Sequence, residues 1–134
     1  MKAILLLSLV IAIHACSGSG SANDQQLSGT DSIIIQFNAP GSDSIVNTVN
    51  TTEPGAIKKL KQFVGDRKAG EYKCGYNGNV QFYAKGALLG DFSFNYAEGC
   101  RHFIQLKNDQ LSSTAMSNEA ANFLKSLAEG RSSY

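Results

Sequence analysis

The 134-residue chain contains no tryptophan, two prolines, two histidines and three cysteines. The shortage of histidine and cysteine restricts its chemistry, because nucleophilic catalysis and zinc binding draw heavily on these residues. Lys2 is one of 12 basic residues, so removing it with a leader peptide leaves 11 basic against 11 acidic residues. This near-neutral balance, with a single basic cluster at Lys58, Lys59 and Lys61, argues against nucleic acid as a partner.

One long apolar run is present, and it lies at the N-terminus. Lys2 precedes an apolar segment from Ala3 to Ile13, and Ala15 stands before Cys16. A positive residue, an apolar core and a small residue in this order are typical of a secretory signal peptide. We therefore predict a signal peptide over residues 1–15. The run is too short to cross a bilayer core of about 30 Å as a helix.

Ile13-His14-Ala15-Cys16 resembles the lipobox of bacterial lipoproteins. The resemblance implies that Cys16 becomes the first mature residue and carries acyl chains that hold the protein on an envelope membrane, facing the periplasm or the cell surface. Residues 16–30 are mostly small and polar, which predicts a flexible tether. Residues 31–130 then form one domain, followed by a C-terminal tail at 131–134. The expected partners are the membrane and an envelope or extracellular protein.

Cys74 and Cys100 remain for the domain. In an exported protein, a disulfide bond between them is the default interpretation. A continuous strand over Tyr72–Ala84 would hold them about 10 Å apart, beyond the limit of about 7 Å between the Cα atoms of a disulfide. Gly75 and Asn77-Gly78 can bend the chain at this point. The sequence therefore predicts the bond together with a bend before the strand.

Hydrophobic periodicity predicts an α+β domain. A β-branched run at Ser32–Phe37 and a weaker alternation at Ser44–Val49 indicate strands, and a period of two extends from Tyr72 to Ala115. Helix-capping residues and apolar stripes predict helices after Thr51-Thr52-Glu53-Pro54 and after Ser117, closed by Gly65 and Gly130. We expect an antiparallel meander of four to five strands with both helices packed on one face.

Three turns set the expected register. Three-residue loops at Ala84-Lys85-Gly86 and Ala97-Glu98-Gly99 would place residue 82 opposite 88 and residue 92 opposite 104. A further turn at residues 107–110 would place Leu106 opposite Leu111. The resulting apolar face contains Val80, Phe82, Leu88, Phe92, Phe94, Tyr96, His102, Ile104 and Leu106. The polar face contains Gln81, Tyr83, Asp91, Ser93, Asn95, Arg101, Gln105 and Lys107.

This pattern predicts no catalytic residue, no metal site and no cofactor. His102 is the one histidine outside the leader, and the register buries it on the apolar face. Cys74, Cys100 and His102 lack the paired spacing of zinc ligands, and phosphate-binding and nucleotide-binding motifs are missing.

Two sets of residues are candidates for surface roles. Asp31-Ser32-Ile33 and Asp43-Ser44-Ile45 resemble the O-glycosylation motif of exported proteins in Bacteroidetes, with Ser32 and Ser44 as the acceptors. Tyr72, Tyr76 and Tyr83 are candidate aromatic anchors for a partner.

Three functions fit these observations. The first is a non-enzymatic binding module, which the lack of a recognisable catalytic set favours. The second is an inhibitor or immunity protein against an exported hydrolase. Tyr72-Lys73-Cys74-Gly75 followed by Val80-Gln81-Phe82-Tyr83 resembles the opening of the c-type lysozyme inhibitor family, although two helices do not belong to that all-β fold. The third is a thiol- and histidine-dependent enzyme or metal carrier that uses His102 and a free Cys100.

Overall fold

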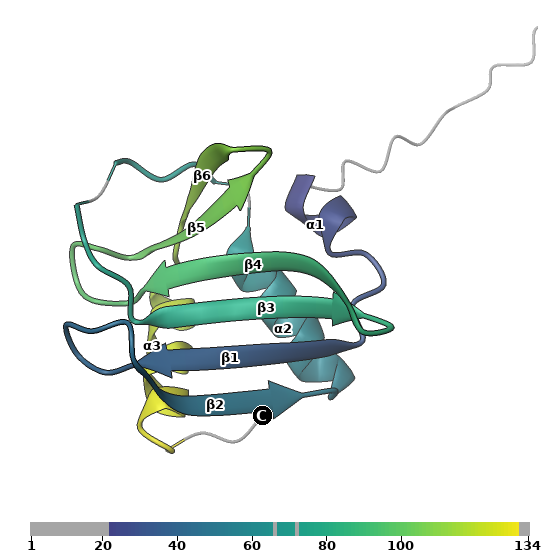
Figure 1. Cartoon of the computed structure of the whole chain (residues 1–134), viewed down its shortest axis with the longest axis horizontal. Helices are drawn as coiled ribbons and strands as arrows, with labels where there is room; N and C mark the ends of the chain where they lie inside the picture. Colours follow the sequence, from purple (N-terminus) through teal and green to yellow (C-terminus); the bar gives the residue numbers. More distant parts are fainter. Residues whose placement is uncertain (1–21, 66, 72, 132–134) are drawn as a thin grey trace, which may run out of the picture.

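Six strands form one antiparallel sheet in the order β2-β1-β3-β4-β5-β6 (Figure 1). The computed structural model describes residues 22–65, 67–71 and 73–131. The strands are β1 Ser32–Asn38, β2 Ile45–Thr51, β3 Gly78–Ala84, β4 Ala87–Asn95, β5 His102–Lys107 and β6 Gln110–Ala115. The predicted α+β class is confirmed, but the sheet has six strands rather than four to five. The weak alternation at Ser44–Val49 belongs to a complete edge strand with polar residues at inward positions.

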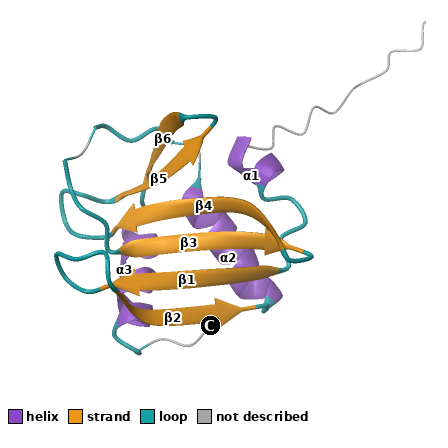
Figure 2. Ribbon diagram, in the orientation of Figure 1, coloured by secondary structure: helices purple, strands orange, loops and turns teal. Residues whose placement is uncertain are grey.

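Two longer helices, α2 Pro54–Val64 and α3 Asn118–Ala128, cover one face of the sheet (Figure 2). The Glu53 side chain accepts a hydrogen bond from the Ala56 amide, and Ser117 accepts one from the Ala120 amide. These bonds satisfy amides that the first turn of a helix leaves without intrahelical partners. Helix α2 ends at Gly65, as the sequence predicts, with a φ of 26°.

The core lies between this helix-covered face and the two helices. Its sheet side is rich in aromatic and β-branched residues, which alternate with outward-facing residues along each strand. The buried sheet residues are Ile33, Ile35, Phe37, Val80, Phe82, Phe92, Phe94 and Phe103. They meet Ile57, Leu60, Phe63 and Val64 of α2 and Ala120, Ala121, Leu124 and Leu127 of α3.

The register between β3 and β4 differs from the prediction. Lys85 and Gly86 both have positive φ angles, 50° and 79°, so they form a two-residue turn rather than part of a three-residue loop. Tyr83 therefore pairs with Leu88, and an irregularity before Tyr83 brings Phe82 opposite Gly90. Leu88 is exposed instead of buried in the predicted apolar face.

The register between β4 and β5 is also shifted by one residue. Ser93 pairs with Ile104 and Phe94 with Phe103, whereas the prediction placed residue 92 opposite 104. A shift of one residue exchanges the two faces of a strand. As a result, Phe103 and Gln105 are buried toward the helices, while Leu106 is 64% exposed. The last turn is as predicted, with Leu106 opposite Leu111.

A short helix, α1 Ala22–Gln26, lies where β4 and β5 separate (Figure 1). These strands pair at only three positions, from Ser93 to Asn95. Beyond them, the Gln26 side-chain amide donates to the Leu89 carbonyl at 2.9 Å and accepts from Lys107 Nζ at 3.1 Å. Leu27 is 0% exposed. The fold thus begins before Asp31, since part of the expected tether contributes a core residue.

Candidate binding surface

The face of the sheet that the helices leave uncovered, here called the outer face, carries a polar centre. Cross-strand pairing places Asn79 beside Ser93 and Gln81 beside Asp91 on β3 and β4. On the neighbouring strands, Ile104 pairs with Ser93, and Leu106 pairs with Leu111. The outer face therefore has polar side chains on the central strands and aliphatic ones on β5 and β6.

Hydrogen bonds connect the polar side chains of the outer face. Asp91 accepts from Asn79 Nδ2 at 3.0 Å through one carboxylate oxygen and from Gln81 Nε2 at 2.9 Å through the other. The Tyr83 hydroxyl donates to Gln81 Oε1 at 3.2 Å. Bonds to a charged acceptor are stronger than those between neutral groups. The four side chains consequently form a pre-arranged network across β3 and β4.

A depression of about 520 Å³ lies beside the Asn79 and Asp91 side chains of this network. Its polar lining includes Asn79, Asp91 and Ser93, and its two charged residues, Asp43 and Asp91, are both acidic. Tyr76, Ile45, Ile104, Leu106 and Leu111 supply its apolar lining. Leu111 is 71% exposed and Tyr76 is 41% exposed. Exposed apolar and aromatic side chains around placed polar groups are the composition of a binding surface.

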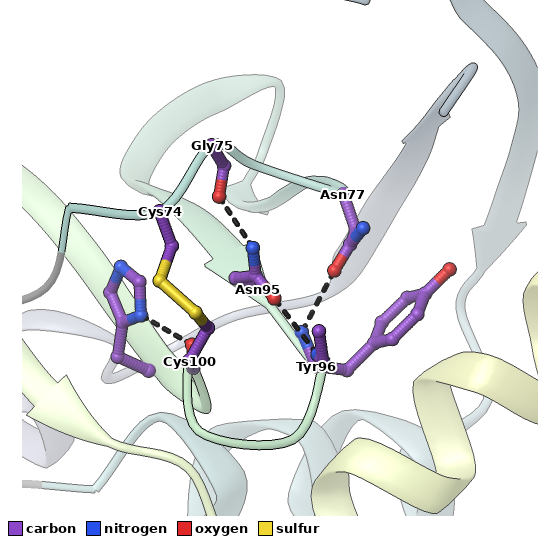
Figure 3. The surroundings of a disulfide bond; sticks show 8 residues. Cys74, Gly75, Asn77, Asn95, Tyr96 and Cys100 are labelled. Carbon is purple, nitrogen blue, oxygen red and sulfur yellow. Dashed lines mark hydrogen bonds between the residues drawn. A yellow bond between two sulfur atoms is a disulfide. The ribbon is translucent and has the colours of Figure 1, made fainter. Parts of the chain in front are cut away.

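A disulfide bond holds the loop that carries Tyr76. Cys74 and Cys100 are bonded, with 6.1 Å between their Cα atoms. The bond forms because β3 begins only at Gly78, so the chain bends before the strand, as the sequence predicts. Figure 3 shows two further connections: Asn95 Nδ2 donates to the Gly75 carbonyl at 2.6 Å, and the Tyr96 amide donates to Asn77 Oδ1 at 2.9 Å. The loop is thereby fastened to the end of β4.

His102 is buried, as predicted, but on the other face. It pairs with Asn95, which belongs to the outer face, and it is 0% exposed. Its Nδ1 lies 2.6 Å from the Cys100 carbonyl oxygen, and its ring centroid is 6.2 Å from that of Tyr76. The disulfide-bonded loop, rather than the helices, therefore surrounds this histidine.

Two of the three predicted tyrosine anchors lie on or beside the outer face. Tyr76 lines the depression, and Tyr83 belongs to the polar network. Tyr72 and the predicted lipidation site Cys16 lie outside the described residues.

The two predicted glycosylation sites differ in their surroundings. Ser32 is half-buried at the start of β1, and its hydroxyl donates to Asp31 at 2.9 Å. The Lys85 amide also donates to the Asp31 carboxylate, and these bonds, the Lys85 bond first, lower the pKa of Asp31. Ser44 is exposed in the loop before β2. Ser44 is the more accessible hydroxyl of the pair.

The aliphatic lining of the depression is the part of the site that sequence reasoning missed. Ile104 and Leu106 were expected in the core, and Ile45 and Leu111 were assigned no surface role. The sequence signal that could have placed these residues at the surface is the Leu106–Leu111 pair, because the two leucines flank a tight turn of polar residues at the end of a hairpin.

Comparison of the chain with protein families, curated proteins and solved structures gave no match. Within residues 22–65, 67–71 and 73–131, no helix combines the length and apolar character needed to cross a membrane. The same residues contain no group of three or more His, Cys, Asp or Glu side chains placed to hold a metal ion.

Proposed function

We propose that the protein is a small, membrane-anchored lipoprotein of a bacterial envelope that acts as a non-enzymatic binding module, and that its outer face contacts a protein partner. The depression on this face carries the proposal. Its hydrogen-bonded centre and its exposed rim of Tyr76, Leu106 and Leu111 are separate from the helix-covered core. Apolar and aromatic anchors beside oriented polar groups are the usual composition of a protein interface.

Two properties of the polar centre favour binding. The Asn79, Gln81 and Asp91 side chains already hold one another in place, so a partner has less side-chain entropy to remove. The charged residues that line the depression, Asp43 and Asp91, are acidic. Complementarity of charge therefore favours a partner that presents a basic side chain at this point.

The membrane anchor in this proposal rests on the sequence. The apolar leader and the lipobox-like Ile13-His14-Ala15-Cys16 support acylation of Cys16. Two or more acyl chains would keep a domain of this size on a membrane. The partner is then a protein of the envelope or of the extracellular space.

An inhibitor or immunity protein is the second candidate, and the disulfide-tied loop beside the depression favours it. In this case the partner is an exported hydrolase, for example an enzyme of the lysozyme type. The bond between Cys100 and Cys74 and the complete burial of His102 disfavour a thiol- and histidine-dependent enzyme or metal carrier, because that function needs a free thiol and an accessible imidazole.

Capture of partners by the full-length chain in its own membrane tests the binding surface. Leu111→Arg places a long cation on the rim of the depression and should reduce the captured partner at least about tenfold, which is the loss expected for an interface anchor. Gln62→Arg makes the same kind of change at an exposed position of α2, on the opposite side of the sheet, and should leave capture unchanged. Equal capture by the Leu111→Arg variant, or loss with Gln62→Arg alone, would contradict the proposal. Inhibition of a captured hydrolase would select the second candidate.

A further inference from the structure

The two edges of the sheet are covered differently. On the β6 edge, the segment Arg67–Ala69, which lies between α2 and β3 in the chain, runs alongside the second half of the strand. The Ala115 amide donates to the Arg67 carbonyl at 2.7 Å, and the Ala69 amide donates to the Ser113 carbonyl at 3.0 Å. Lys68 and Thr114 form an antiparallel bridge between them. Backbone groups of Ser113 and Ala115, in the second half of this edge strand, are thus paired within the chain.

The β2 edge has no such cover among the described residues. β2 pairs with β1 along one side, and Figure 1 shows it at the margin of the sheet. Outside that ladder, no backbone hydrogen bond between described residues reaches positions 45–51. An uncovered edge presents a row of amide and carbonyl groups to any strand that approaches it.

The composition of β2 lacks the features by which edge strands commonly prevent pairing. Its sequence, Ile-Val-Asn-Thr-Val-Asn-Thr, contains no charged residue and no proline. Its one irregularity is at Val46, near the first residue of the strand, since Phe37 pairs with Asn47 and Asn38 pairs with Ile45. The stretch from Asn47 to Thr51 is therefore regular and able to pair.

We propose that this edge pairs antiparallel with the same edge of a second copy of the chain, centred on Val49. In this register Val49 faces its own copy, Asn47 faces Thr51, and Thr48 faces Asn50. The two Thr48–Asn50 pairs place a hydroxyl opposite an amide, whereas Thr51 is buried and its hydroxyl already accepts a hydrogen bond from the Glu53 amide. No like charges meet in this register. This self-complementarity of Asn47–Thr51 is the argument for a second copy rather than an unrelated strand.

Pairing of this kind is symmetric, because each copy contributes the same residues about a twofold axis. Directly opposed residues of an antiparallel pair point to the same face. The helices of both copies would then lie on one side, and two six-stranded sheets would join into one. The two outer faces become continuous, so one assembly presents two copies of the depression.

Cysteine cross-linking of the full-length chain tests the register. Val49→Cys should form a covalent dimer under mild oxidation, because the introduced side chain faces its symmetry mate at about 5 Å between Cβ atoms. Thr48→Cys should cross-link less, because residue 48 faces residue 50 in this register. The unchanged chain controls for dimers through its own cysteines, including Cys16. Cross-linking of Thr48→Cys in preference to Val49→Cys would overturn the register, and an absence of cross-linking with both would overturn the pairing.

Sedimentation of the full-length chain, without an introduced cysteine, tests the dimer independently of cross-linking. The wild-type chain should show a concentration-dependent dimer. Thr48→Lys should raise its dissociation constant at least about tenfold, whereas Ser112→Lys at an exposed position of β6, on the opposite edge of the sheet, should leave it unchanged. Circular dichroism should show that both variants are folded. The proposal would be overturned by a wild-type chain that stays monomeric, even if its edge binds a strand from another protein. A dimer that Thr48→Lys does not weaken would also overturn it.

Discussion

A single glycine at the start of β3 allows this strand to pack closely against β1 and Phe94. Gly78 is the first residue of β3, directly after that loop, and it is buried. A Cβ atom added there would lie 2.9 Å from Phe94 Cζ and would overlap the Gln36 carbonyl oxygen of β1. Gly75, three residues earlier, has no atom within 4 Å of such a Cβ. The glycine at the start of β3 and the glycine within the loop therefore differ greatly in their tolerance for a side chain.

Gly78→Ala should lower the free energy of unfolding by about 3 kcal/mol, at the upper end for overpacking, because the obstructing atoms belong to backbone and to a core ring. Gly75→Ala is the matched control and should change it by less than about 0.5 kcal/mol. Urea denaturation with the disulfide intact measures both. Equal stability of the two variants would show that β3 does not approach β1 and Phe94 this closely.

Residues within a single strand were the most predictable. Gln81, Asp91 and Ser93 were placed on the polar face correctly, because alternation along one strand needs no knowledge of its neighbours. Gln105 was placed there too and is instead buried, because its face depends on the pairing of β5 with β4. The network among these polar side chains depends on cross-strand distances that the sequence does not contain.

At the scale of elements, the turns account for the difference between prediction and structure. The turn between Leu106 and Leu111 was predicted correctly because Asn108 and Asp109 both tolerate the positive φ of a two-residue turn. Lys85 also has a positive φ, which is unusual for lysine, so the sequence favoured a longer loop. The connection from Asn95 to His102 includes Cys100, and its disulfide to Cys74 is a long-range constraint that local turn patterns do not reveal.

Helix α1 shows a different limit of sequence reasoning. Its composition, Ala-Asn-Asp-Gln-Gln, is that of a tether, and it buries no residue of its own. Its place depends on Leu27 immediately after it, on the Gln26 bonds to Leu89 and Lys107, and on the Asp24–Lys61 ion pair at 3.5 Å. A single apolar residue in a polar segment does not predict docking.

Leu27→Ala should lower the free energy of unfolding by about 3 kcal/mol, because it removes a fully buried leucine and leaves a cavity where β4 and β5 separate. Ser28→Ala, at an exposed neighbouring position, should change it by less than about 0.5 kcal/mol. Chemical denaturation of the full-length chain compares the two. If Leu27→Ala is as stable as the wild type, residues 22–30 behave as the tether that their composition indicates.

In the whole molecule, the two faces of the sheet have different surroundings. One face holds the core against α2 and α3, and the other carries the polar network and its exposed rim. The residues of the depression come from the segments around Asp43, Tyr76, Asp91, Ile104 and Leu111. Their assembly requires the complete sheet and the disulfide-bonded loop. The sequence could therefore predict an α+β domain with a polar sheet face, but not the apolar rim that makes this face a candidate interface.

We propose that a domain held at a membrane presents its outer face to a protein partner. Photo-cross-linking in the producing cell tests this arrangement, with a photoreactive residue introduced at Leu106 on the rim or at the exposed Gln62 of α2. We expect a protein adduct from position 106, none from position 62, and loss of the 106 adduct when Cys16→Ala removes the proposed anchor. An adduct from position 62 without one from position 106 would contradict it.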